Sequence, residues 1–159
     1  GKGFGLISDA SKRVLLVGGG VGVAPLLYLG KQLLDAGVTP EFLLGARSAA
    51  DLLMLEEFEA IGKVYSSTED GSAGEKGLVT TNSIFAADFD KIYCCGPMPM
   101  MKAVAALARK KGVACEVSLE NKMACGLGAC LCCVEKKTDG HNVCVCTEGP
   151  VFNINELQW

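Results

Sequence analysis

Histidine, tryptophan and long apolar segments are scarce in this 159-residue sequence, which contains one histidine and one tryptophan. A single histidine excludes a Rieske centre, because that centre takes two histidine ligands. No apolar run reaches the ~18 residues that a membrane-spanning helix needs, so no membrane contact is expected. Paired catalytic carboxylates and a Ser/His/Asp set are also missing. General acid–base catalysis is therefore not the expected role of this chain.

Basic residues do not gather anywhere beyond the triplet Arg109–Lys111, and the net charge is −3. That triplet precedes Gly112, where the C-terminus of a helix favours cations, so we expect no nucleic-acid ligand. The N-terminus is not a secretory signal, and a cytoplasmic protein is expected. Half of the residues are apolar, which is enough for a folded core.

Short apolar runs alternate with helical periods over the first two-thirds of the chain. Strands are expected at residues 13–17, 41–45, 63–67, 91–95 and 114–119. Helices are expected at about 23–34, 51–61, 78–85 and 98–111. This alternation predicts an α/β fold with a doubly wound, parallel, five-stranded sheet. We assign residues 1–119 to this nucleotide-binding domain and residues 120–159 to a small cysteine-rich domain.

Two of the predicted strands end in unusual turns. Gly18–Pro25 is a glycine-rich turn that enters a helix, so its backbone N–H groups could face a phosphate. It is not the G-x-G-x-x-G fingerprint, because Val23 takes the last glycine position, and a simple tight turn is the alternative. At Cys94–Met100 a small cysteine and a glycine leave room for a flat ring. Buried small residues at a strand-to-helix turn would explain the same pattern.

Nine cysteines are present, and Cys125, Cys130 and Cys133 follow the x4/x2 spacing of plant-type [2Fe–2S] ligation. The odd count and a reducing cytosol disfavour a disulfide framework. A zinc ribbon would need two separated C-x2-C pairs, which the chain does not provide cleanly. Spacing leaves the fourth ligand open between Cys144 and Cys146. Cys132 interrupts the spacing and is expected to be an inert neighbour.

Three segments together carry a resemblance to a known family: Gly18–Leu26, Cys95–Met100 and Glu120–Phe152. They resemble the electron-transfer subunit of B-type, NAD-linked dihydroorotate dehydrogenase, whose NAD-binding domain is similar to those of the ferredoxin–NADP reductase superfamily. The resemblance covers nearly the whole chain and identifies Cys146 as the fourth cluster ligand. Family members carry a flavin-binding β-barrel ahead of this region, so we expect the sequence to be the C-terminal part of a longer subunit.

This resemblance implies that electrons pass from dihydroorotate, through FMN in a separate catalytic subunit, to the [2Fe–2S] cluster, then to FAD and NAD⁺. FAD is expected in the full-length subunit, since most of its contacts lie in the barrel. NAD contacts are expected from the glycine turn, from two strand-end loops and from the Cys95 turn: Gly18, Gly19, Gly20, Gly22, Arg47, Asp70, Cys95, Gly96, Pro97 and Met98. For Glu69, beside Asp70, a solvated loop position is the competing interpretation.

A hetero-oligomer with the FMN-containing catalytic subunit is the expected assembly. Three other functions fit the same residues. The chain could serve a different dehydrogenase, could carry electrons without binding a nucleotide, or could be a zinc-stabilised interaction module.

Overall fold

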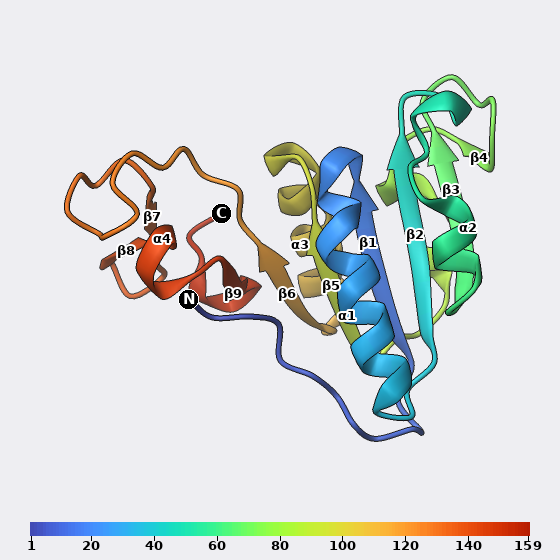
Figure 1. The fold of residues 1–159 in the computed structure, drawn as a ribbon, viewed down its shortest axis with the longest axis horizontal. Coiled ribbons are helices and arrows are strands. Elements are labelled where there is room, and N and C mark those ends of the chain that lie inside the picture. Colours follow the sequence, from blue (N-terminus) through green and yellow to red (C-terminus); the bar gives the residue numbers. More distant parts are fainter.

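The computed structural model describes residues 1–159 and contains one large sheet with a small hairpin beside it (Figure 1). The large sheet has the order β4-β3-β2-β1-β5-β6-β9, and all of its pairs are parallel except β6 with β9. Its strands are β1 (Val14–Gly19), β2 (Pro40–Ala46), β3 (Lys63–Thr68), β4 (Glu75–Lys76), β5 (Lys91–Cys95), β6 (Ala114–Ser118) and β9 (Val151–Asn153). The five predicted strands are confirmed, and β4 and β9 extend the sheet at its two edges.

Helices cover both faces of this sheet, as a doubly wound fold requires. α1 (Val23–Asp35) and α2 (Leu55–Glu59) share one hydrophobic core, in which Leu33 and Phe58 are fully buried. α3 (Met98–Lys111) packs on the opposite face through Val104. β1 is buried along its whole length, because it is a central strand that is covered on both faces. No helix is both long and apolar enough to cross a membrane.

Two predicted helices differ from the structure. Residues 78–85 form two 3-10 turns, Val79–Thr81 and Ser83–Ala86, so the prediction of one helix was wrong. Asn82 between them has an extended backbone, and its side chain accepts a hydrogen bond from the Ile84 N–H at 3.0 Å. The helix expected at 51–61 is reduced to α2, since residues 49–51 form a separate 3-10 turn.

The cysteine-rich segment forms a lobe beside β6 (Figure 1). It contains the hairpin of β7 (Val134–Lys136) with β8 (Asn142–Cys144), the single-turn helix α4 (Val145–Glu148) and β9. β9 returns to the large sheet and pairs antiparallel with β6. Cys133, Val143 and Phe152 are buried in the same hydrophobic cluster as Val104 of α3. The lobe and the sheet therefore share one core, and the division at residue 119 stays a prediction.

The first residues of the chain run from this lobe to the sheet. Lys2 forms a backbone bridge with Pro150. The carbonyl oxygen of Gly5 then accepts hydrogen bonds from Lys91 Nζ at 2.9 Å and from the Tyr93 hydroxyl at 2.7 Å. The N-terminal segment thus fastens the cysteine-rich lobe to the face of the sheet that carries α1.

Candidate functional site

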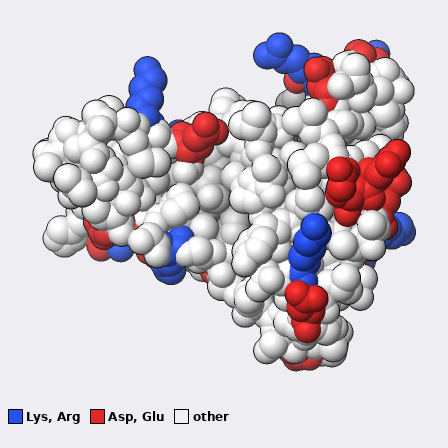
Figure 2. Space-filling view, in the orientation of Figure 1, with Lys and Arg blue, Asp and Glu red and all other residues white.

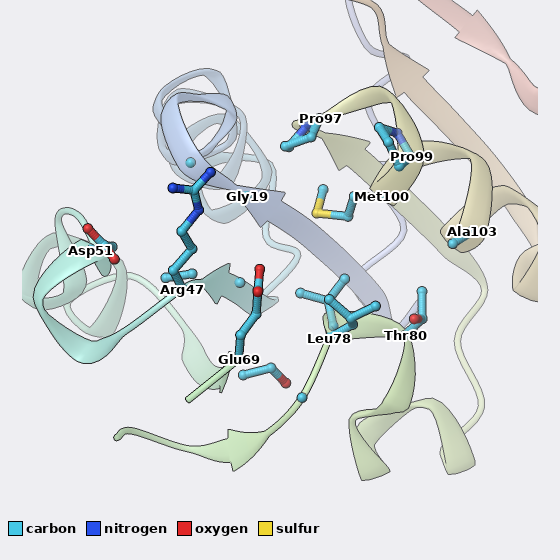
Figure 3. A pocket seen from close by; sticks show the side chains of 16 residues that line it. Gly19, Arg47, Asp51, Glu69, Leu78, Thr80, Pro97, Pro99, Met100 and Ala103 are labelled. Carbon is cyan, nitrogen blue, oxygen red and sulfur yellow. The ribbon is translucent and has the colours of Figure 1, made fainter. Parts of the chain in front are cut away.

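A cavity of about 580 Å³ opens at the carboxyl edge of the sheet (Figure 3). The turn after β1, the ends of β2 and β3, the loop that follows β4 and the first turns of α3 enclose it. Its lining residues are Gly19, Gly20, Gly45, Ala46, Arg47, Asp51, Ser67, Glu69, Gly77, Leu78, Val79, Thr80, Pro97, Pro99, Met100 and Ala103. Ligands of open α/β sheets bind at this edge, beyond the carboxyl ends of the strands.

The glycine-rich turn serves two separate purposes. Gly19 and Gly20 line the cavity, and Gly20 has a φ of +55° with open space where a Cβ would lie. Gly22 instead packs against the next turn, since its Cβ would lie 2.6 Å from the Cys95 carbonyl oxygen. A Cβ on Gly96 would likewise lie 3.0 Å from the Gly19 carbonyl oxygen. Close packing of two turns therefore presents the N-terminal end of α1 to the cavity, where its dipole favours an anion.

Four of the ten predicted nucleotide contacts line this cavity: Gly19, Gly20, Arg47 and Pro97. The other six lie outside its lining: Gly18, Gly22, Asp70, Cys95, Gly96 and Met98. Gly18 faces α1, because its Cβ would lie 3.0 Å from the side chains of Leu26 and Val23. Contact of any of the ten with a nucleotide stays a prediction.

Charged side chains gather at one end of the cavity. Arg47 and Glu69 both project into it (Figure 3), and neither takes part in an ion pair. Asp70 is occupied within its own loop, where it accepts hydrogen bonds from the Ser72 hydroxyl at 2.6 Å and the Ser72 N–H at 2.9 Å. These bonds lower the pKa of Asp70. Of these two adjacent carboxylates, only that of Glu69 lines the cavity.

Several lining residues were not predicted. Pro99, Met100 and Ala103 come from α3, and Leu78 and Thr80 come from the loop after β4. Met100 lies within the Cys-Gly-Pro-Met-Pro-Met segment, which was the available signal for it. Because residues 78–85 were predicted to form a helix, Leu78 was not assigned to the site. Its exposed side chain lines the cavity.

The four predicted ligand cysteines lie in two pairs. Cys125 Sγ accepts hydrogen bonds from the backbone N–H groups of Leu127 and Cys130, both at 3.3 Å. These bonds lower the pKa of Cys125 to about 6. Cys133 Sγ accepts a bond from the Cys146 N–H at 3.4 Å, which lowers the pKa of Cys133. No three side chains of metal-ligand type converge on a single point.

The chemistry of these donors fits an iron–sulfur cluster. Thiolates are the ligands of such clusters, and backbone N–H groups directed at sulfur favour the thiolate form. Gly126 and Gly128 have φ values of +67° and +78°, so the loop can turn its backbone toward the sulfurs. Leu131 also has a positive φ, +58°, which is uncommon for a residue with a large side chain.

The remaining cysteines of the lobe lie outside these pairs. Cys132 is exposed and takes part in no hydrogen bond. Cys144 ends β8, and its thiol donates to the Gly128 carbonyl oxygen at 3.8 Å. Cys146 lies in α4 rather than on a strand, so strand alternation does not relate Cys144 to Cys146. All nine cysteines of the chain are free.

Comparison with families of known proteins gives two consecutive matches. Residues 16–106 match the model of an oxidoreductase NAD-binding domain, and residues 120–158 match the iron–sulfur cluster binding domain of dihydroorotate dehydrogenase B. The electron transfer subunit of dihydroorotate dehydrogenase B (NAD⁺) from Caldanaerobacter subterraneus subsp. tengcongensis is 42% identical over 161 residues. The subunit of the same name from Shouchella clausii is 44% identical over 164 residues. Each alignment covers 99% of this chain but only 63% and 62% of those relatives.

Solved structures share the same fold. The structure of an NADH-dependent reduced ferredoxin–NADP oxidoreductase superimposes with a TM-score of 0.82 at 39% identity, covering 92% of this chain and 54% of that one. The cytochrome b5 reductase domain of Ulva prolifera nitrate reductase has a TM-score of 0.55 at 24% identity, covering 64% of this chain and 46% of that one. The second likeness concerns the fold alone.

Proposed function

Because the chain belongs to the family of oxidoreductase NAD-binding domains, we propose that it is the NAD- and cluster-binding part of an electron-transfer subunit of dihydroorotate dehydrogenase B, an enzyme of pyrimidine biosynthesis. The similarity to electron transfer subunits of that name over 99% of the chain carries the proposal. The chain spans about 63% of such a relative. Dihydroorotate oxidation is therefore assigned to the whole assembly.

In this proposal Cys125, Cys130, Cys133 and Cys146 hold a [2Fe–2S] cluster, which supplies one-electron transfer when bound. The backbone N–H groups of Leu127, Cys130 and Cys146 support the choice, since they donate to sulfurs of this set. They stabilise the thiolates before iron arrives and reduce negative charge on the sulfurs afterwards.

NAD lies along the carboxyl edge of the sheet in the same proposal. Gly19 and Gly20, with the N-terminus of α1, receive the pyrophosphate, and Arg47 and Glu69 lie at the adenosine end. The turn from Cys95 to Pro97 borders the nicotinamide end. FAD of the full-length subunit would be held mainly by residues outside these 159.

A partner subunit, the FMN-containing catalytic subunit, completes the proposed assembly. The residues from 123 to 134 include no charged side chain. Met123, Leu127 and Leu131 of this segment are exposed, and the lobe in Figure 2 is largely free of charged atoms. An exposed apolar surface of this kind is typical of a protein–protein contact, and here it surrounds the proposed cluster ligands.

Glu69→Gln is expected to reduce discrimination between NAD⁺ and NADP⁺. A carboxylate at the adenosine ribose accepts a hydrogen bond from its 2′-hydroxyl and repels a 2′-phosphate. Since Glu69 is exposed, screening limits the change in the ratio of the two Kd values to about 5- to 10-fold. Titration of this chain with both nucleotides measures it. Glu57→Gln, which removes one exposed charge from α2, is the matched control. Equal changes in the ratio of the two Kd values in the two variants would contradict this role for Glu69.

The visible spectrum of the anaerobically purified protein, with and without dithionite, tests the proposed function together with NADH titration. We expect broad bands at ~400–600 nm that bleach on reduction, two irons per chain, and saturable NADH binding. Zinc in place of iron, in protein expressed with iron supplied, would contradict the cluster. Iron without saturable binding of any nucleotide would instead favour a carrier without an NAD site.

A second candidate is supported by the likeness to the NADH-dependent reduced ferredoxin–NADP oxidoreductase, at 39% identity. In that case the same two sites would serve a different partner enzyme. Reconstitution of the full-length subunit with a dihydroorotate dehydrogenase catalytic subunit separates the two candidates. NAD⁺ reduction that depends on dihydroorotate supports the first, and a complex that forms only with another flavoprotein supports the second.

A further inference from the structure

The loop of residues 126–132 is anchored to the rest of the cysteine-rich lobe at Gly128. Six of these seven residues are exposed, and Gly128 alone is half-buried. One hydrogen bond joins the loop to a residue outside 125–133: the Cys144 thiol donates to the Gly128 carbonyl oxygen at 3.8 Å. An added Cβ on Gly128 would also lie 3.3 Å from Cγ2 of Thr147. Cys144 and Thr147 therefore form the surface on which the loop rests, and we call these two residues the loop seat.

The loop seat is itself fixed by hydrogen bonds at the start of α4. The Cys144 N–H donates to Glu148 Oε1 at 3.3 Å. The Thr147 hydroxyl donates to the Cys144 carbonyl oxygen at 3.3 Å. Two side chains of this single-turn helix thus hold both backbone polar groups of Cys144. A thiol on a backbone fixed in this way has a defined position, so it can determine where Gly128 lies.

The same helix holds the second pair of predicted cluster ligands. Cys146 is one of its residues, and the Cys146 N–H donates to Cys133 Sγ at 3.4 Å. The Val145 N–H donates to the Cys133 carbonyl oxygen at 3.1 Å. One turn of helix therefore carries one predicted ligand, fixes a second, and supports the loop that joins Cys125 to Cys130.

We propose that the loop seat positions the cluster ligands: by holding Gly128 on α4, it keeps the loop with two of the predicted ligands next to the pair that α4 carries. This inference rests on the proposed cluster and concerns two residues that do not bind iron. Without the seat, the exposed loop would gain conformational freedom, and each ligand that it supplies would cost more entropy to hold in place. The seat should therefore slow the loss of iron and contribute little to the stability of the fold.

Removal of the Cys144 thiol tests the hydrogen bond of the seat. Cys144→Ala deletes the donor, and an excess of EDTA should remove iron from this variant about 10-fold faster, since residues that support metal ligands typically contribute 10- to 100-fold. Cys144→Ser keeps a donor, and the exposed loop can move toward the shorter side chain, so most of the retention should return. Cys132→Ala, which removes an exposed thiol of the same lobe, should leave the rate unchanged. The decay of the visible absorbance of anaerobically purified protein measures the rate.

Two glycines separate the contact with Thr147 from backbone strain. Gly126 and Gly128 have φ values of +67° and +78°, so alanine is strained at both. The added Cβ would meet nothing within 4 Å on Gly126, but would lie 3.3 Å from Thr147 on Gly128. Gly128→Ala should therefore lose iron about 5-fold faster than Gly126→Ala. Addition of Thr147→Ala to Gly128→Ala should restore slow release, because the new methyl group takes the place of the deleted one.

Melting of the iron-free proteins separates positioning from folding. Cys144→Ala should melt within about 3 °C of the unmodified chain, because its hydrogen bond reaches only an exposed loop. A larger decrease that Cys144→Ser does not reverse would show a role in folding and contradict the proposal.

Equal rates of iron loss from Cys144→Ala and Cys132→Ala, or from Gly128→Ala and Gly126→Ala, would overturn the loop seat and leave the cluster function intact. Loss of the cluster from both Cys144→Ala and Cys144→Ser would also overturn it, because Cys144 would then be a ligand. An unmodified chain that binds no iron when iron and sulfide are supplied would overturn the cluster function and this inference together.

Discussion

Cys130→Ser is expected to abolish the visible absorption of the cluster and to reduce bound iron to below about a quarter of the unmodified level. Serine removes one of four thiolates, and its hydroxyl stays protonated at neutral pH, so it is a far weaker ligand than a thiolate. The backbone N–H of Cys130, which donates to Cys125 Sγ at 3.3 Å, is kept in the variant, so the effect reports the loss of the Cys130 thiolate. Iron analysis and the absorption spectrum of anaerobically purified protein measure the effect.

Cys132→Ser is the matched control for this loss. Cys132 differs from Cys130 by two positions in the same exposed loop, but it takes part in no hydrogen bond. Its replacement should leave both the iron content and the spectrum unchanged. A bleached Cys132→Ser protein, or a Cys130→Ser protein with its full spectrum, would show that the four-cysteine ligand set is wrong.

Gly22→Ala is expected to lower the melting temperature by about 6–12 °C, which corresponds to about 3 kcal/mol for a domain of this size. The added Cβ would lie 2.6 Å from the Cys95 carbonyl oxygen and the Gly96 Cα. These are backbone atoms, so no side-chain rotation can relieve the overlap. The backbone of Gly22 is ordinary, with a φ of −64°, and conformational strain is not the cause.

The same substitution should weaken NADH binding by at least about tenfold, because separation of the two turns moves Gly19 and Gly20 at the cavity wall. Calorimetric melting and NADH titration measure the two effects. Gly3→Ala is the control, since an added Cβ there meets nothing within 4 Å. Equal melting temperatures for the two variants would mean that the turn adjusts without cost.

The central part of the fold was readable from sequence because its signals are local. β1 ends at consecutive glycines, α1 has a clear apolar period, and α3 ends at Gly112 with a φ of +68°. β9 was not predicted, because it has three residues and its pairing with β6 depends on chain folding over a long separation. The 3-10 turns after residue 78 were not predicted either, because their backbone conformation depends on the hydrogen bonds of Asn82, one of which joins it to the distant Ser67.

The two candidate sites differ in the same way. The pair of Cys125 and Cys130 follows from spacing, because residues five positions apart in a loop are close wherever the loop lies. Cys146 came from the family resemblance instead, since spacing alone left the fourth ligand open between Cys144 and Cys146. The cavity gathers side chains from separate elements, so Met100 of α3 and Leu78 could be placed there only by the structure. Asp70 was predicted and Glu69 was not, since the hydrogen bonds of Asp70 to Ser72 decide which of two adjacent carboxylates is free.

β9 belongs to the edge of the sheet, yet the chain reaches it only after it has passed through the whole cysteine segment. Residues 120–159 are therefore unsuited to grafting onto another protein as an independent redox module. Excision after residue 119 would leave β6 as an open strand edge, and such edges promote aggregation. It would also remove Phe152 and Val143 from the core that they share with α3. Engineering that aims to exchange the cluster while it retains the nucleotide domain should replace the loop between β6 and β7 and keep β9 in place.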